Sequence, residues 1–283
     1  MSSTPESSID TERRFGGLAR LLGPSAPARL ARSHVVVVGI GGVGSWTAEA
    51  LARSGVGALT LVDLDVVSES NVNRQLHALS HTLGQSKIQA MADRIAGINP
   101  GCRLTLIDDF VTSDNVAQLL DGDYDAILDC ADQAPAKIAM ILHAREKRVP
   151  IVVCGGAGGK TDPLALRGGD LSTALNDALL AKLRNVLRRQ HGFARASDQA
   201  GKPRKRVPKM NVFALWFDQP AILPTAWTSA AGSLADVDSP SLRTEAPMGL
   251  ACAGYGSIVT VTAAMGMAAA HRAVQWIVER DRE

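Results

Sequence analysis

The sequence predicts an α/β protein with a Rossmann-like, doubly wound and mainly parallel sheet, followed by a less regular C-terminal half that faces the substrate. Two observations carry this prediction. Short β-branched runs alternate with segments of helical periodicity from Ser33 to about Gly168, as in a parallel sheet with helical crossovers. The first run, HVVVVG, also leads directly into a glycine-rich turn and a helix, which is typical of nucleotide-binding folds.

Strands and helices are expected to alternate in order along the first half of the chain. The predicted strands are the short apolar runs at residues 34–39, 58–63, 102–108, 124–130 and 150–155. The predicted helices show apolar spacing of about 3.6 residues and cover residues 42–55, 86–99, 113–120 and 135–147. Gly55 and Pro100 are the expected stop signals of the first two helices. A long last helix is expected from about Ile258 to Glu279.

The domain organisation follows from where this regular pattern begins and weakens. We expect a disordered leader at residues 1–12, a nucleotide-binding domain at residues 13–165 and a substrate-facing half at residues 166–283. The opening MSSTPESSID has no basic segment followed by an apolar stretch, so it is not a secretory signal and the cytoplasm is the expected location. Residues 249–270 carry no charge but are rich in Gly, Ala, Ser and Thr, which favours a buried helix over a membrane span.

Charge is distributed very unevenly along the 283 residues. Residues 181–210 hold ten Lys or Arg and one acid, a net charge of +9, which leaves −7 for the remainder of a chain whose total is +2. Such asymmetry favours a surface that faces a polyanion, with nucleic acid as the commonest one, although a solvated loop explains the charge equally well. The candidate RNA contacts in this segment are Arg188, Arg189, Arg204, Lys205 and Arg206.

The four cysteines carry no metal or disulfide pattern. Cys102, Cys130, Cys154 and Cys252 are scattered without a C-x-x-C pair, which argues against zinc and against a disulfide framework. We interpret them as small core residues.

The glycine-rich turn predicts a nucleotide site. Gly39, Gly41 and Gly44 form G-x-G-x-x-G between a strand and a helix, where glycines let the backbone approach phosphates and the helix N-terminus offers free N–H groups. Asp63 ends the next strand and is well placed to accept from ribose hydroxyls. These features fit a dinucleotide as well as ATP.

The stretch after Asp63 favours a triphosphate. A triphosphate concentrates more negative charge than a dinucleotide pyrophosphate and needs cations or a metal. This stretch supplies Arg74 and Lys87, beside the amide side chains of Asn71 and Gln75. Asp132 follows a later strand, at the edge where open parallel sheets bind ligands, and is the candidate ligand for Mg²⁺ on the phosphates.

At this point the sequence resembles the ubiquitin-activating-enzyme-like adenylating enzymes of the ThiF/MoeB/HesA type. The motifs that match are G-x-G-G-x-G-S at residues 39–45, D-x-D-x-V at 63–67, S-N-x-x-R-Q at 70–75, G-Q-S-K ending at Lys87 and D-C-x-D at 129–132. Within that family the chain is most similar to the tRNA threonylcarbamoyladenosine dehydratase branch, on RRFGGLARLLG, GGAGGKTDP and CAGYGSIVTVTAAMGMAAA. The resemblance implies ATP-dependent adenylation of the threonyl carboxylate beside a tRNA anticodon, followed by closure to a cyclic base.

The resemblance also implies roles for individual residues. Arg14 matches an arginine that reaches into the ATP site of a partner subunit, and so implies a homodimer. The matches to nucleotide-binding, phosphate-binding and metal-binding positions are Gly39, Gly41, Gly42, Gly44, Asp63, Ser70, Asn71, Arg74, Lys87 and Asp132. A monovalent cation and a sulfur-transfer protein are further candidates that the sequence does not locate.

The departures from the branch lie in the substrate-facing half. The chain has Asp177-Ala178-Leu179 where D-P-L is expected, ALWFD in place of Ser-x-Glu, and EAPMGL in place of a basic pair before Cys252. Lys160 stands where the branch needs no lysine and is assigned no role. These differences concern the acceptor rather than the ATP chemistry.

Two other classes of function stay open at the level of sequence. Adenylation of the C-terminus of a ubiquitin-like or sulfur-carrier protein would use the same ATP site, but the zinc cysteines common among such enzymes are missing. An NAD-dependent oxidoreductase would explain the glycines and Asp63 while leaving Arg74, Lys87 and Asp132 without a role.

Overall fold

The computed structural model describes residues 10–198, 202, 204, 205, 207–224 and 252–280. The strands are β1 (His34–Val38), β2 (Ala58–Val62), β3 (Arg103–Ile107), β4 (Ala126–Asp129), β5 (Ile151–Cys154), β6 (Leu166–Asp170) and β7 (Phe213–Phe217). The α-helices are α1 (Thr11–Phe15), α2 (Gly17–Leu22), α3 (Ala26–Arg32), α4 (Gly44–Arg53), α5 (Lys87–Ile98), α6 (Val116–Leu119), α7 (Ala134–Lys147), α8 (Ala178–Gln190), α10 (Cys252–Tyr255) and α11 (Val259–Glu279). Short 3-10 helices are η1 (Glu69–Asn71), η2 (Ser80–Thr82), η3 (Pro163–Ala165) and η4 (Leu171–Thr173).

The strands form one sheet in the order β3-β2-β1-β4-β5-β7-β6. Every neighbouring pair is parallel except β6 and β7, which are antiparallel, so the predicted fold class is confirmed. β1 pairs with β2 on one side and with β4 on the other, with Val38 opposite both Val62 and Asp129. The crossovers therefore leave in opposite directions at β1 and β4, which opens a crevice at the carboxyl ends of these strands.

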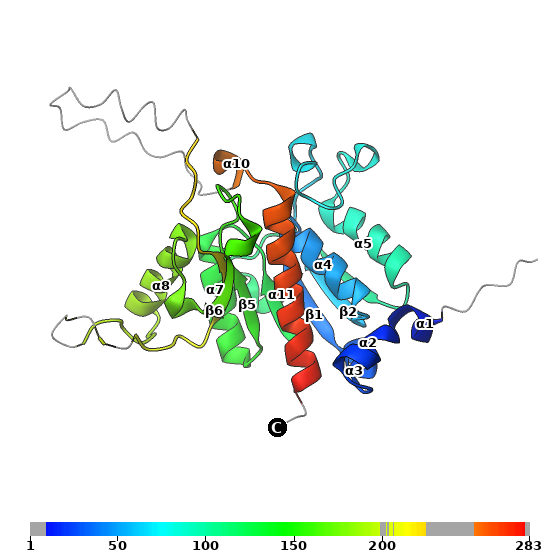
Figure 1. Ribbon diagram of the computed structural model, residues 1–283, viewed down its shortest axis with the longest axis horizontal. Helices are drawn as coiled ribbons and strands as arrows, with labels where there is room; N and C mark the ends of the chain where they lie inside the picture. The colour runs from blue at the N-terminus through cyan, green and yellow to red at the C-terminus, as the bar shows by residue number, and fades with distance from the viewer. Residues whose placement is uncertain (1–9, 199–201, 203, 206, 225–251, 281–283) are drawn as a thin grey trace, which may run out of the picture.

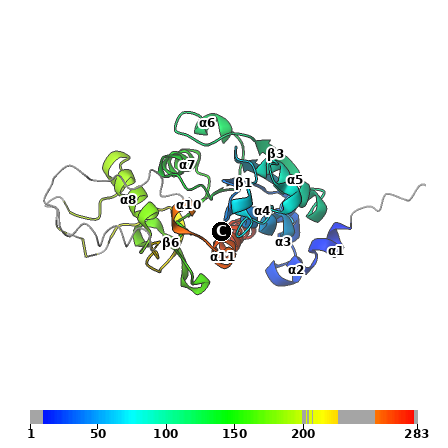
Figure 2. The ribbon, with the colours of Figure 1, turned by 90° about the horizontal axis from the view of Figure 1, so that it is seen from above.

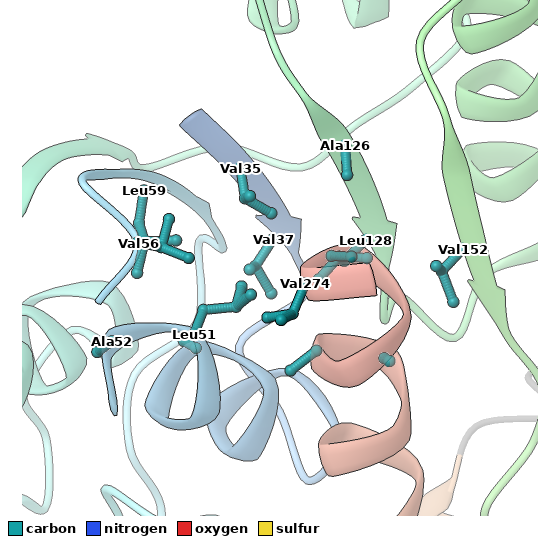
Figure 3. Packing of buried hydrophobic residues seen from close by; sticks show 14 of the residues in the cluster. Val35, Val37, Leu51, Ala52, Val56, Leu59, Ala126, Leu128, Val152 and Val274 are labelled. Atoms are coloured by element: carbon teal, nitrogen blue, oxygen red, sulfur yellow. The ribbon is translucent and has the colours of Figure 1, made fainter. Parts of the chain in front are cut away.

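The two faces of the sheet are covered by different helices. Val35 and Val37 of β1 belong to the buried cluster that packs against α4 and α11 (Figure 3). Val36 and Val38 point the other way into the cluster under α7 and α8, because side chains alternate along a strand. Figure 2 shows α7 and α11 on opposite sides of the sheet.

Helix α11 lies across the front of the sheet beside α4 (Figure 1). A Cβ on its Gly266 would lie 2.5 Å from the carbonyl oxygen of Val43, so small residues allow the two helices to approach closely. This confirms the prediction of a buried helix for the part of 249–270 that begins at Val259. The backbone leaves the helical conformation at Gly256, whose φ is 73°, so α10 and α11 are separate helices. No helix of the described part of the chain is long and apolar enough to cross a membrane.

The second half of the chain contributes elements that the sequence pattern does not reveal. β7 is inserted beside β5, β6 forms the antiparallel edge, and α8 packs against α7. The boundary expected at residue 165 therefore lies within one continuous sheet. The N-terminal boundary also differs, because α1 begins at Thr11, inside the expected leader. The Asp10 side chain accepts from the Arg13 amide and caps this helix, so residues 10–12 are ordered.

Candidate functional site

A cavity of about 490 Å³ opens at the carboxyl ends of the parallel strands. What we call its first wall is formed by two segments, residues 39–44 after β1 and residues 63–75 after β2, together with Lys87 at the start of α5; not every residue of these segments lines the cavity. Its second wall consists of residues 155–160 after β5 and residues 176–179 at the start of α8. The loop after β4, which contains Asp132, lies between the two walls. The volume is typical of sites for small molecules.

Two of the predicted glycines permit close backbone packing at the end of β1, one against the loop after β4 and one at the start of α4. Gly39 has a φ of 86°, in the left-handed region, and a Cβ there would lie 2.9 Å from the Ala131 nitrogen. A Cβ on Gly44 would lie only 1.8 Å from the carbonyl oxygen of Gly39. A side chain at Gly44 would force α4 away from the strand that precedes it, and a side chain at Gly39 would collide with the backbone of the loop after β4.

Like Gly39, the other two glycines, Gly41 and Gly42, line the cavity. A Cβ on Gly41 would meet nothing within 4 Å, so this position faces open space. A Cβ on Gly42 would lie 3.2 Å from the side chains of both Arg74 and Thr262. The bare backbone here and the N-terminus of α4 behind it form a turn that can donate N–H groups to phosphate oxygens.

Asp63 fixes the turn from beneath. Its Oδ2 accepts from the Ile40 amide at 2.6 Å and its Oδ1 accepts from the Asp65 amide at 2.9 Å. Only 7% of the residue is exposed. Burial raises the pKa of Asp63, against the lowering effect of Lys87 and of the two amides. Asp63 lines the cavity with acceptor capacity left on both oxygens, as a contact to ribose hydroxyls requires.

The two cations predicted for the first wall both line the cavity. Lys87 is 6% exposed, and its Nζ lies 2.6 Å from Oδ2 of Asp65. Nη1 of Arg74 donates to the Ser70 carbonyl at 2.7 Å, and the Arg74 carbonyl accepts from Nε1 of Trp46 at 3.1 Å. The structure therefore brings together two cationic side chains that the sequence separates by 13 positions.

Ser70 and Asn71 stabilise the loop that carries Arg74. Asn71 is buried, lines the cavity, and its Oδ1 accepts from the Ser68 amide at 3.1 Å. Ser70 is exposed and does not line the cavity; its hydroxyl lies 2.9 Å from that of Ser68.

Asp132 projects from the loop after β4 and is exposed at the cavity. The strand beneath it is anchored by a fully buried ion pair, with Lys137 Nζ 2.9 Å from Oδ1 of Asp129. The same oxygen of Asp129 accepts from the Ala131 amide at 3.2 Å, next to Asp132. Burial raises the pKa of Asp129, and Lys137 opposes that shift. Asp129 is thus a structural group, while Asp132 is free to face a ligand.

Arg14 lies far from the cavity of its own chain. Its Nη1 donates to the carbonyl oxygen of Ile98 at 2.6 Å, at the last residue of α5. Lys87 is the first residue of the same helix, which places the two ends roughly 16 Å apart at 1.5 Å per residue.

The basic residues predicted to contact RNA are not one uniform surface. Arg189, Arg204 and Lys205 are exposed, and Nε of Arg204 donates to the Ser197 carbonyl at 3.2 Å. Arg188 is half-buried, and its Nε and Nη2 are buried without a hydrogen-bond partner. Arg206 lies outside the described residues. Arg188 therefore differs from the exposed candidates in having part of its guanidinium buried, and its contact with RNA stays a prediction.

The second wall contains polar residues that sequence reasoning missed. Asp177 caps α8 by accepting from the Leu180 amide at 2.8 Å, and its other oxygen accepts from the Gly156 amide at 2.8 Å. An acidic residue before an apolar run, as in NDALLAKL, is a helix-start signal that could have located it. Lys160, which was assigned no role, also lines the cavity and is 4% exposed.

Two cysteines lie at the cavity. Sγ of Cys130 is 4.0 Å from Sγ of Cys154, and both thiols are free. The neighbouring Cys130 and burial raise the pKa of the Cys154 thiol. Burial also raises the pKa of Cys102 to about 11, so these two thiols suit a packing role. The side chain of Cys252 lies outside the described residues.

Comparison with known proteins places this geometry in a family. Residues 16–283 match the ThiF family. The chain is 41% identical to the tRNA threonylcarbamoyladenosine dehydratase of Escherichia coli over 264 residues, covering 93% of this chain and 92% of that protein. It is 37% identical to the protein of the same name from Haemophilus influenzae over 281 residues, covering 99% of each. The Escherichia coli molybdopterin-synthase adenylyltransferase is 35% identical over only 42% of this chain and 48% of that protein.

The fold is similar along the whole chain to solved structures. The crystal structure of the Escherichia coli tRNA N6-threonylcarbamoyladenosine dehydratase in complex with ATP superposes with a TM-score of 0.80 at 37% identity, covering 97% of this chain and 98% of that one. Its complex with AMP gives a TM-score of 0.79 at 38% identity, covering 98% of both chains.

Proposed function

The chain belongs to the ThiF family, and we propose that it catalyses the ATP-dependent dehydration of threonylcarbamoyladenosine in tRNA to the cyclic base. The observation that carries this proposal is the single cavity that gathers the glycine turn, Asp63, Arg74, Lys87 and Asp132. Two nearly full-length relatives bear the name of this activity, whereas the carrier-protein adenylyltransferase aligns with less than half of the chain.

The first wall is the ATP site in this proposal. Asp63 binds the ribose, Asn71 lines the cavity beside the nucleotide, and the turn of Gly41 and Gly42 cradles the phosphates. An ATP complex and an AMP complex of a similar protein support a nucleotide that is cleaved to AMP.

Adenylation is the first chemical step. An oxygen of the threonyl carboxylate attacks the α-phosphorus, the bond to the bridging oxygen breaks, and pyrophosphate leaves. Arg74 and Lys87 stabilise the negative charge that builds on the α-phosphate and on the leaving group. Lys87 is held for this role by Asp65, which orients its Nζ at 2.6 Å.

The residues at the cavity fit a magnesium ion on the phosphates. Asp132 offers an exposed carboxylate beside the phosphate turn, and Mg²⁺ in such sites is held by one or two carboxylates together with phosphate oxygens and water. Asp132 would hold the ion, which when bound neutralises charge on the triphosphate. We propose no zinc site, because the four cysteines are scattered in the sequence.

Ring closure is the second step. The carbamoyl group of the same modified base attacks the activated acyl carbon and loses one proton to water, and the bond between that carbon and the leaving AMP oxygen breaks. No enzyme thiol is needed, because the reacting groups belong to one molecule and are already close. This agrees with the raised pKa of the buried Cys154 thiol, which suits packing rather than nucleophilic attack.

Arg14 acts in this proposal across a homodimer interface. Its guanidinium lies at the far end of α5 from Lys87, so it does not reach the phosphates of its own chain in this arrangement. A partner subunit that presents α1 to the cavity would supply a further positive charge to the leaving pyrophosphate.

The tRNA reaches the cavity over the second half of the chain. The exposed basic residues Arg189, Arg204 and Lys205 are available to contact its phosphates. We place the reaction in the cytoplasm, where tRNA is modified, and treat a sulfur-transfer protein as a partner that the reaction does not require.

Pyrophosphate release tests the proposed function. The purified chain should release pyrophosphate from ATP only with tRNA that carries threonylcarbamoyladenosine, and not with the same tRNA transcribed without modification. Release that depends instead on a protein with a Gly-Gly tail would replace this function by carrier adenylation. ATP turnover that ignores the modified tRNA would contradict the proposal.

A further inference from the structure

Lys160 is a buried lysine at the cavity that the ATP chemistry does not use. Its Nζ donates to the carbonyl oxygen of Asn176 at 2.8 Å and to that of Gln219. These contacts join three segments that are far apart in sequence: the loop after β5, the turn before α8 and the residues after β7. Only 4% of the residue is exposed, yet it belongs to the cavity lining.

The charge of Lys160 is held by dipoles rather than cancelled by a contacting carboxylate. Among the residues that the structure describes, no carboxylate forms an ion pair with its Nζ. Burial lowers the pKa of Lys160, whereas the charges of Asp177 and Asp218 raise it and favour the ammonium form. Two carbonyl acceptors use two of its three N–H groups, which leaves one donor for a ligand.

The position of Lys160 separates it from the phosphate-binding cations. Arg74 and Lys87 follow β2, while Lys160 follows β5, three strands further along the sheet. At about 4.8 Å between neighbouring strands, the two groups belong to positions roughly 14 Å apart. Figure 1 shows the ends of β2 and β5 on either side of α11.

A positive charge at this second position would assist the reaction. The acceptor is a carboxylate, and it must approach a triphosphate that repels it. Lys87 is paired with Asp65, and Arg74 lies beside the glycine turn, so both belong to the nucleotide. A cation on the other wall would bind the carboxylate without competing for the phosphates.

We propose that Lys160 binds the acceptor carboxylate and makes this site selective for an acid over its uncharged analogues. The inference rests on the proposed function and adds to it a residue that recognises the acceptor. The two main-chain carbonyls fix the ammonium in place, so that its remaining N–H meets the carboxylate before the attack on the α-phosphorus.

The test compares two acceptors on two proteins. The probes are an anticodon stem-loop that carries threonylcarbamoyladenosine and the same stem-loop with the carboxylate replaced by a carboxamide. Binding of each is measured in the presence of a non-hydrolysable ATP analogue. The wild-type chain should bind the acid about tenfold or more tightly than the amide, the size expected for a charge-assisted hydrogen bond. K160Q and K160M should bind the acid and the amide stem-loops with affinities that differ by no more than about twofold.

Controls separate recognition from mere structural support. K147Q removes an exposed lysine on α7, away from the cavity, and should keep the full preference for the acid. KM for ATP should stay within about twofold in K160Q while KM for the modified tRNA rises. An unchanged preference for the acid in K160Q overturns the proposal. The proposal is also overturned if K160Q binds ATP, the acid stem-loop and the amide stem-loop all more weakly and has a lowered melting temperature, because Lys160 then only supports the structure. Failure of the wild type to bind either stem-loop would count against the proposed function itself.

Discussion

The two walls of the cavity are held in place by different kinds of contact. The first wall depends on backbone geometry. Gly39 lets the end of β1 approach the loop after β4, Gly44 lets α4 begin against the end of β1, and Asp63 accepts from the amides that shape the turn. The second wall depends on side chains that reach main-chain groups of distant segments, as Lys160 does to Asn176 and Gln219. A wall for a constant nucleotide is thus built into the start of the fold, while the wall for the acceptor is assembled from several parts.

The largest expected effect comes from a substitution in the loop between the two walls. D132N should lower the rate of pyrophosphate release by about 10²–10³, the range for removing one electrostatic group at a reacting centre. Because Asp132 is exposed, thermal stability should hardly change. D123N, at an exposed aspartate away from the cavity, is the matched control. Normal turnover in D132N would remove this residue from the chemistry.

A Cβ added to the first wall should break it. G44A places a carbon 1.8 Å from the Gly39 carbonyl oxygen, so we expect a loss of about 3 kcal/mol or more in the free energy of unfolding. G41A meets open space and should stay within about 0.5 kcal/mol of the wild type. Urea denaturation of both variants measures the difference. Equal stabilities would show that close packing does not hold this wall.

Acid should weaken the loop that supports the first wall. His77 is 2% exposed, and burial together with the charge of Lys87 lowers its pKa from 6.5 to about 4. Between pH 6.5 and pH 4 the unfolded state therefore binds a proton at His77 that the folded state does not bind. The contribution of His77 to the free energy of unfolding is complete above pH 6.5 and is lost as the pH falls towards 4. Its full size is about 3 kcal/mol.

Unfolding free energies measured from pH 7 to pH 4 check this prediction. The free energy of unfolding of H77Q should fall less steeply with pH over that window than that of the wild type. H81Q changes an exposed histidine four positions away and should follow the wild-type curve. Parallel curves for H77Q and the wild type would contradict the assignment to His77.

The smallest effect is expected on the second wall. D177A removes the cap of α8 and the contact to the Gly156 amide, and should cost about 1–2 kcal/mol of stability. KM for the modified tRNA should rise while KM for ATP stays the same, because Asp177 belongs to the acceptor side. A change in KM for ATP of the same size would mean that the two walls are not separate.

The first wall could be predicted from the sequence because its requirements select residue types. Gly44 must lack a side chain, and the strand before it is rich in β-branched residues. Both features can be recognised from residue types in the sequence. Asp132 can be predicted from its position, since ligands bind where parallel strands end, and it lines the cavity.

The second wall could not be predicted in this way. The partners of Lys160 are main-chain carbonyls, which every residue possesses, so no residue type in the sequence identifies them. β6 contains Gly168 and Gly169 and lies at the sheet edge, which hides its strand character. The basic residues of α8 obscured a helix with buried Leu179, Leu180, Leu183 and Leu187.

The most direct test of the whole account is mass spectrometry of tRNA nucleosides after incubation with the purified chain and ATP. We predict that threonylcarbamoyladenosine loses one water to give the cyclic base, with one AMP and one pyrophosphate formed for each base converted, and that D132N leaves the base open. An unchanged base in the wild-type reaction, under conditions in which the protein binds both ATP and the modified tRNA, would contradict it.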